Sequence, residues 1–306
     1  MRERSPWHPW IDDVDEQVRL QLLPDGVRHL HQSGAVRLRV VLDESAPVLG
    51  DRTLQCSPHW GNAVGTPSPL DRRSVYAKME GVPIRGVLFD WRGTLIRDPD
   101  DSWWVRTALD RIGRTVDESE VVDLVRRLQA ASKVQAVAEA QGGADCSADL
   151  HREATMLWYR EADLDSEFAE ALYALDREAV AHPLFEDVPE SLETINALGV
   201  RIAIVSDIHF DLRPEFAQLG LDRFVDHFVL SFEHGVQKPD FRIFTLALDL
   251  LDVHASEALM VGDRAARDGG AIDVGISTLL LPTVQGPLRG LDSVLDLIGP
   301  RPVPST

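Results

Sequence analysis

The second half of the chain alternates short apolar runs with segments of helical periodicity, and this alternation limits the possible folds more than any other feature. Apolar runs at 84–90, 200–207, 226–231, 258–263 and 276–282 have the length and composition of buried strands. The helices expected between the later runs cover 188–199, 215–220, 240–251 and 268–275. Strands and helices in such alternation form a parallel sheet with helices on both faces. The sequence therefore predicts a Rossmann-like, doubly wound α/β core.

A long helical block separates the first strand from the second. Apolar residues recur three and four positions apart in segments at 101–112, 117–140, 147–162 and 165–180, and no strand pattern interrupts them. Asp or Ser precedes several of these segments, as expected of residues that cap helix N-termini. The block predicts an α-helical domain inserted into the core.

Residues 1–80 differ from the rest of the chain and carry no recognisable chemistry. They contain a Gly/Pro/Ser-rich stretch at 56–70 that is typical of a linker, and one short alternating run at 35–42 that is consistent with a strand. Two interpretations stay open. The segment is either a small appended subdomain or a weakly structured stretch ahead of a physiological start at Met79.

Charge and cysteine content exclude several classes of protein. The chain has 50 acidic residues against 31 Lys and Arg, a net charge of −19, which disfavours nucleic acids and anionic membranes as partners. Cys56 and Cys146 form neither a disulfide framework nor a CxxC pair. No apolar run is long enough to span a membrane, and the N-terminus lacks the apolar run of a signal peptide. We therefore expect a cytoplasmic protein with no membrane partner.

Polar residues stand where four of the predicted strands end or where the next helix begins. In a parallel sheet these ends meet at one edge, which is where ligands bind. Each residue alone is more commonly a helix cap or a solvated charge, but their joint occurrence in order favours a catalytic site. The residues are Asp90, Ser206, Asp207, Lys238, Asp263 and Asp268.

These residues belong to four motifs that resemble, in order, those of the haloacid dehalogenase superfamily. The motifs are DWRGTL at 90–95, IVS at 204–206, GVQKPD at 235–240 and GDRAARD at 262–268. The resemblance extends over about 84–285, and the helical block resembles the inserted helical cap of that superfamily. It implies a core formed by 84–98 and 184–298, with the cap at 99–183.

The resemblance implies a Mg²⁺-dependent hydrolase, most typically a phosphatase that acts on a small phosphorylated metabolite. Asp90 would attack phosphorus and form an aspartyl-phosphate that water then hydrolyses. Ser206 would bind the phosphoryl oxygens, and Lys238 would neutralise charge on nucleophile and phosphate. Lysine is rare here, with three among the 31 basic residues, so its presence at position 238 supports this role.

The same resemblance implies a set of oxygen ligands for Mg²⁺ and further contacts to substrate. The ligands would be the carboxylates of Asp90 and Asp263 and the backbone carbonyl of Arg92, with Asp268 in a supporting position. Further substrate-binding positions would be Gly93, Thr94 and Asp207. The sequence identifies neither the substrate nor the oligomeric state.

Arg92 departs from the pattern, because phosphatases of this superfamily usually carry a second Asp at that position as general acid and base. A guanidinium does not titrate in proteins, and loss of general acid–base help costs on the order of 10²- to 10⁴-fold in rate. One interpretation is a substrate with a good leaving group, such as an acyl phosphate. In a second, another residue supplies the proton, the candidates being His209, Asp211 and His234. A third is a slow or non-catalytic protein that binds phosphorylated ligands.

Two other branches of the superfamily lack that second Asp. The metal-free dehalogenases fit less well, because Asp263 would have no role there. Phosphonoacetaldehyde hydrolases use a cap lysine as a Schiff base, and Lys133 is the one lysine within the predicted cap. Its surroundings differ from that family's motif, so we expect Lys133 to be a solvated helix residue.

Overall fold

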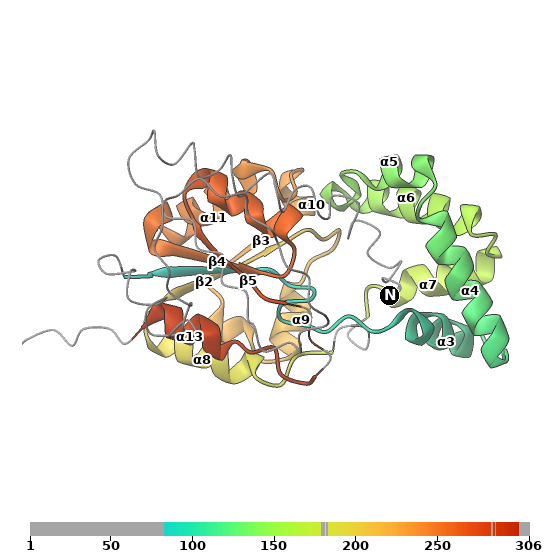
Figure 1. Cartoon of the computed structure of the whole chain (residues 1–306), viewed down its shortest axis with the longest axis horizontal. Helices are drawn as coiled ribbons and strands as arrows, with labels where there is room; N and C mark the ends of the chain where they lie inside the picture. Colours follow the sequence, from blue (N-terminus) through green and yellow to red (C-terminus); the bar gives the residue numbers. More distant parts are fainter. Residues whose placement is uncertain (1–82, 179–180, 182, 283, 285, 300–306) are drawn as a thin grey trace, which may run out of the picture.

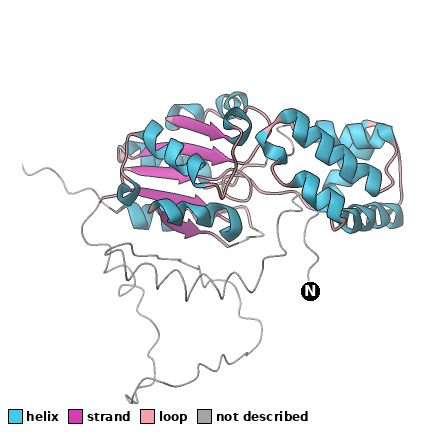
Figure 2. Ribbon diagram, turned by 90° about the horizontal axis from the view of Figure 1, so that it is seen from above, coloured by secondary structure: helices cyan, strands magenta, loops and turns pink. Residues whose placement is uncertain are grey.

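The computed structural model describes residues 83–299 except 179–180, 182, 283 and 285. The strand expected at 35–42, the linker at 56–70 and the alternative start at Met79 lie outside this part. The described chain forms two lobes, a sheet-containing core and a helical cap (Figure 1). Figure 2 shows the strands side by side with helices on both sides, and the cap beyond one end of the strands.

The core contains a parallel sheet of five strands in the order β3-β2-β1-β4-β5. The strands are β1 (Gly86–Phe89), β2 (Arg201–Ser206), β3 (His227–Leu230), β4 (Ala258–Gly262) and β5 (Ser277–Leu280). The order runs outward in both directions from the central β1, which confirms the prediction of a doubly wound α/β core.

Successive side chains of the strands point to opposite faces of the sheet, and each face packs on its own helices. Phe89 faces a hydrophobic cluster with α8 (Val188–Ala197), α9 (Arg213–Gln218) and α13 (Asp292–Ile298). Leu88 faces a second cluster with α11 (Phe241–Leu251). Helices therefore bury both faces of the sheet, and α8 and α13 lie opposite α11 in Figure 1.

Five α-helices and a short 3₁₀ turn form the cap, around a hydrophobic cluster of their own. They are α3 (Asp101–Arg111), α4 (Glu118–Ala131), α5 (Gln135–Gln141), η1 (Ala144–Cys146), α6 (Ala148–Glu161) and α7 (Ser166–Leu175). The expected N-caps are present: the side chains of Asp100, Asp117, Ser147 and Asp165 accept hydrogen bonds from backbone N–H groups of the first turns of α3, α4, α6 and α7.

Three helices differ from those expected. The segment 117–140 forms two helices, because Val134 is extended and the Ser132 hydroxyl donates to the Gln129 carbonyl in a turn. The last cap helix ends at Leu175 instead of continuing through the segment to 180. Instead of a helix over 268–275 the core has α12 (Ala265–Asp268) and a 3₁₀ segment, η5 (Gly269–Val274), since consecutive glycines weaken an α-helix.

Three further short elements complete the described core, η3 (Asp222–Phe224), α10 (Ser231–His234) and η4 (Ala255–Glu257). Among the described residues, no helix has the length and apolar character needed to cross a membrane.

Two linkers join the cap to the core, and they pair with each other. Ile96 and Leu184 form an antiparallel bridge. On either side, the Arg97 N–H donates to the Pro183 carbonyl at 2.8 Å and the Phe185 N–H donates to the Leu95 carbonyl at 3.1 Å. The chain thus enters and leaves the cap through one short two-stranded ladder. The exact boundaries between core and cap, at 98/99 and 183/184, stay a prediction.

Candidate active site

The expected site residues gather at the carboxyl ends of the central strands. Asp90 directly follows β1, Ser206 ends β2, and Asp263 directly follows β4. Strand order reverses around β1, and in sheets of this kind such a point opens a crevice for a ligand. A pocket lies there between the core and the cap, lined by residues of both lobes.

A buried lysine joins two of the predicted carboxylates. Lys238 Nζ donates to Asp90 Oδ1 at 2.5 Å and to Asp268 Oδ1 at 2.7 Å. The lysine is only 2% exposed, and its charge is therefore compensated inside the protein. Although burial opposes the charged form, the carboxylates of Asp268 and Asp90 raise the pKa of Lys238, so the ammonium stays protonated.

The second oxygen of Asp90 is also held in place. Thr94 Oγ1, on the tight turn that follows β1, donates to Asp90 Oδ2 at 3.1 Å. Thr94 is fully buried and is not among the residues that line the pocket. Its side chain therefore orients Asp90, and any contact that position 94 makes to substrate stays a prediction.

Three carboxylates, those of Asp90, Asp263 and Asp268, offer oxygen atoms within 4.8 Å of one another. Asp263 Oδ1 is buried and accepts no hydrogen bond from the described residues; Arg264 Nε lies 3.9 Å from it. Burial and the neighbouring Asp90 and Asp268 charges outweigh Arg264 and raise the pKa of Asp263 to about 8. Buried like charges with an unsatisfied oxygen fit a hard divalent cation that takes oxygen ligands, such as Mg²⁺.

Glycine is required where the β1 turn approaches this cluster. Gly93 has φ +76°, a conformation that side chains rarely adopt. A Cβ at position 93 would lie 2.3 Å from Asp263 Oδ2. The turn therefore packs directly on the carboxylate, which is the structural role that Gly93 has here.

Arg92 points toward the cap and contacts Asp176. Its Nη2 lies 2.7 Å from Asp176 Oδ1, at the end of α7, and 3.4 Å from the Asp176 carbonyl oxygen. Burial alone would raise the pKa of Asp176, but the Arg92 guanidinium, by its charge and its hydrogen bond, outweighs burial and holds the pKa well below its usual range. The position that usually holds a general acid thus holds a buried link between the two lobes.

Two further expected residues, Ser206 and Asp207, lie at the carboxyl end of β2. Ser206 and Asp207 line the pocket, but the Asp207 carboxylate already accepts the Lys238 backbone N–H at 2.8 Å. Arg267 lies 3.6 Å from Asp207. Burial outweighs the Lys238 and Arg267 charges and raises the pKa of Asp207 to about 6.

Among the three alternative proton donors, only His209 lines the pocket. Asp211 and His234 are exposed, and Asp211 pairs with Arg213 at 2.9 Å. Lys133 is exposed in the turn between α4 and α5 and does not line the pocket either. This placement agrees with the expectation of a solvated lysine and does not support a Schiff base.

The cap residues of the pocket went unpredicted, apart from the general role of the cap. One face of α6 supplies several of them, at helical spacing, and η1 and α7 supply others. One feature of the sequence does point to a pocket on α6. Thr155 is a polar residue that is buried within an otherwise apolar face of this helix. The cap residues that line the pocket are Trp104, Gln141, Ala144, Asp145, His151, Ala154, Thr155, Trp158, Tyr159, Leu172, Tyr173 and Asp176.

Comparison with known proteins agrees with this geometry. A family model for haloacid dehalogenase-like hydrolases matches residues 84–275. A ribulose-1,5-bisphosphate 5-phosphatase of Halopiger xanaduensis is 41% identical over 99 residues, 32% of this chain and 41% of the relative. A glyceraldehyde 3-phosphate phosphatase of Pyrococcus abyssi is 40% identical over 87 residues, 28% and 37% of the two chains. The matches thus span about two fifths of these relatives' length.

A solved structure also shares the fold. A dehalogenase with an intermediate complex superposes with a TM-score of 0.51 at 22% identity, over 68% of this chain and 89% of that one. At this identity the likeness establishes the fold alone. The match of the family model covers most of the described core and cap.

Proposed function

This chain belongs to the haloacid dehalogenase-like hydrolase family, and on that premise we propose that it is a Mg²⁺-dependent phosphatase of a small phosphorylated metabolite. The relatives named above are phosphatases of small phosphorylated compounds, which supports this class of substrate. The observation that carries the proposal is the buried Lys238 between Asp90 and Asp268, beside the unpartnered Asp263 oxygen.

Asp90 is the nucleophile in this proposal. Hydrogen bonds from Lys238 and Thr94 hold its carboxylate in place directly after β1. A carboxylate oxygen forms a bond to phosphorus, the bond from phosphorus to the leaving oxygen breaks, and the leaving group departs with the electron pair. Water then attacks the aspartyl-phosphate, which releases inorganic phosphate and restores Asp90.

The remaining residues offset negative charge. Lys238 stays positively charged beside the attacking oxygen, and the buried hydroxyl of Ser206 lines the same pocket as a donor for phosphoryl oxygens. Asp90 and Asp263 would hold Mg²⁺ with the Arg92 carbonyl, and Asp268 would support them. When bound, the ion supplies positive charge that reduces the repulsion between carboxylate and phosphate.

The leaving group receives no proton from position 92. Arg92 is always charged and is engaged with Asp176. Burial and the neighbouring His151 lower the pKa of His209 to about 3, so His209 is neutral at pH 7 and is a poor acid. The site therefore favours substrates whose leaving group needs no protonation, such as acyl phosphates.

A panel of phosphorylated metabolites that includes acyl phosphates tests this proposal, with and without Mg²⁺. We expect turnover that depends on Mg²⁺ and is greatest for acyl phosphates. Asp90→Asn should abolish it, while Asp249→Asn, a matched change of an exposed carboxylate on α11, should not.

A second candidate is a phospholigand-binding protein without turnover, favoured by the use of Arg92 as a link to the cap. Calorimetry on the same panel separates the two. Tight binding with no phosphate release at any Mg²⁺ concentration would establish the second and overturn the first.

A further inference from the structure

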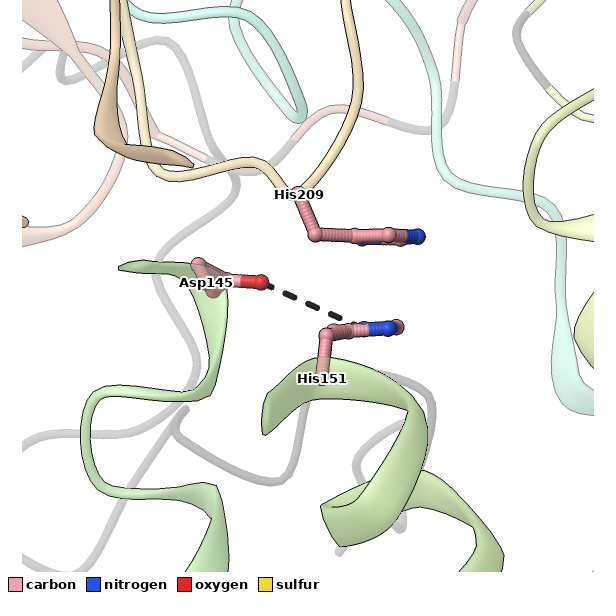
Figure 3. A group of neighbouring side chains, drawn as sticks. All are labelled: Asp145, His151 and His209. Carbon is pink, nitrogen blue, oxygen red and sulfur yellow. Dashed lines mark ion pairs between the residues drawn. The ribbon is translucent and has the colours of Figure 1, made fainter. Parts of the chain in front are cut away.

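A second cluster of metal-ligating side chains lies between the two lobes. Its members are His209 in the loop after β2, His151 on α6 and Asp145 in η1 (Figure 3). We propose that Asp145, His151 and His209 bind a divalent transition-metal ion of the Zn²⁺ class between the cap and the core. The proposal does not depend on phosphatase activity.

The three side chains already lie close to the spacing that such an ion requires. Their ligand atoms are within 4.8 Å of one another, and His151 Nε2 is 4.0 Å from Asp145 Oδ1. Tetrahedral Zn²⁺ with bonds of about 2.1 Å places its ligands about 3.4 Å apart. Closing the site therefore needs shifts of about 1 Å.

One ring must also turn. The imidazoles of His151 and His209 stack face to face, with centroids 3.5 Å apart and planes 6° apart, as Figure 3 shows. Their lone pairs lie in the ring planes, so two parallel rings do not point at the same ion. The His151 side chain is 19% exposed and that of His209 only 3%, so His151 is the ring with freedom to rotate.

The histidines have ring nitrogens that nothing else satisfies. His209 Nε2 and His151 Nδ1 are buried and have no hydrogen-bond partner among the described residues. Each buried polar atom without a partner costs about 1–3 kcal/mol, and one bound ion would satisfy one nitrogen of each ring.

The donor chemistry separates this site from the carboxylates around Asp90. Imidazole nitrogen together with one carboxylate suits Zn²⁺, Co²⁺ or Ni²⁺, whereas an all-oxygen set suits Mg²⁺. Asp176 Oδ2 lies 3.8 Å from His209 Nε2 and is within reach as a further oxygen ligand. The negative charges of Asp145 and Asp176 favour a cation at this position.

A metal ion here would hold the cap against the core. Asp145 and His151 belong to the cap and His209 to the core, so a shared ion would join the lobes beside the Arg92–Asp176 pair. Because all five side chains line the active-site pocket, such a bond would limit how far the pocket opens.

Co²⁺ is the probe for the experiment, because its visible absorption reports its ligands. The full chain is stripped with a chelator and titrated with Co²⁺, followed by displacement with Zn²⁺. We expect one equivalent to bind with the absorption of an imidazole-containing site. Asp263→Asn, which removes the Mg²⁺ carboxylate, should retain this equivalent.

His151→Gln should weaken Co²⁺ binding by about 100-fold or more, since loss of a second-shell partner alone costs 10- to 100-fold. His254→Gln, at an exposed histidine, is the matched control and should bind as the wild type does. His209→Gln and Asp145→Asn should also bind weakly, with circular dichroism to check folding at the buried position 209. Equal Co²⁺ affinity in wild type and His151→Gln, or no Co²⁺ absorption in Asp263→Asn, would overturn the proposal.

Discussion

Two polar clusters share one pocket but are built differently. The carboxylate–lysine cluster consists of Asp90, Lys238, Asp263 and Asp268, and the cap–core cluster consists of Arg92, Asp145, His151, Asp176 and His209. The first comes entirely from the core: Asp90 and Asp263 directly follow β1 and β4, Lys238 lies in the loop before α11, and Asp268 ends α12. The second takes residues from both lobes and exists only while the cap lies against the core. The comparison teaches that reactive groups are fixed by the sheet, whereas access to them is controlled by contacts between the lobes.

Removal of Lys238 should produce the largest effect and separates the first cluster from the second. In Lys238→Met, Asp90 and Asp268 lose their shared partner inside the protein. We expect the free energy of unfolding to fall by about 3–5 kcal/mol, measured by denaturant titration. The rate of phosphate release should fall on the order of 10³-fold.

The matched control is Lys133→Met, which removes an exposed cap lysine. Its unfolding free energy should stay within about 0.5 kcal/mol of wild type. Equal losses in the two variants would mean that the buried ammonium contributes nothing specific to the carboxylate–lysine cluster.

Within the cap–core cluster, His209 should make the free energy of unfolding depend on pH. Burial lowers the pKa of His209 to about 3, below its ordinary value of 6.5. Between these values the unfolded chain binds a proton that the folded one excludes, so this contribution is complete above pH 6.5 and is lost as pH falls. We expect the His209 contribution to fall by about 3 kcal/mol between pH 7 and pH 4, measured as the difference between the denaturant titrations of wild type and His209→Asn in the presence of a chelator.

His209→Asn should flatten that slope, and His254→Asn should leave it unchanged. If the free energy of unfolding depended on pH in the same way in wild type and His209→Asn, the folded protein would not exclude a proton from His209.

The link between Arg92 and Asp176 should contribute less, and a double-mutant cycle measures it. Arg92→Met and Asp176→Leu each leave a buried charge unpaired, whereas the double variant leaves none. We expect a coupling of about 1.5–3 kcal/mol in the free energy of unfolding.

Arg152 and Glu170 form an exposed pair on the cap surface and provide the control cycle. Their coupling should stay below about 1 kcal/mol. If the two cycles gave the same value, the Arg92–Asp176 pair would be no stronger than a solvated one.

The smallest expected effect concerns how each cluster's metal affinity depends on pH. The pKa of Asp263 is raised to about 8 by burial and by Asp90 and Asp268, so a proton must leave before Mg²⁺ binds. Affinity for Mg²⁺ should fall about tenfold for each pH unit below 8, about 1.4 kcal/mol per unit. Calorimetry in buffers of different ionisation enthalpy should detect close to one proton released per Mg²⁺ at pH 7.

His209 is already neutral, so Co²⁺ binding at the cap–core cluster should release no proton from it over the same range. An equal pH dependence for both metals would remove this distinction between the clusters.

The sequence was sufficient for the sheet and for the first cluster. Short apolar runs predicted the five strands, and parallel strands bring their carboxyl ends together regardless of the length of the connections. Asp90 and Lys238 therefore meet although 148 positions separate them. The resemblance to the family is confirmed by the match of its model, while the roles of individual site residues remain predictions.

The sequence alone did not predict the cap–core cluster. Arg92 identified the loss of the usual proton donor, but its partner Asp176 depends on how the cap rests on the core. His151 lies on α6, and helical periodicity predicts which positions of a helix are buried but not which residues of the core they contact. The break at Ser132–Val134 was missed for a related reason, because a local turn competes with a helical pattern that continues through it.

The ladder between the linkers has a consequence for how the enzyme opens. With Ile96 bridged to Leu184 and a hydrogen bond on each side, the two connections bend together as a ribbon. Hinges between lobes are a few loop residues that absorb large changes in φ and ψ, and here the residues of the two connections are hydrogen-bonded to each other. Each movement of the helical lobe should therefore follow nearly the same path, and α6 should return to the same position relative to Asp90 each time the lobes close.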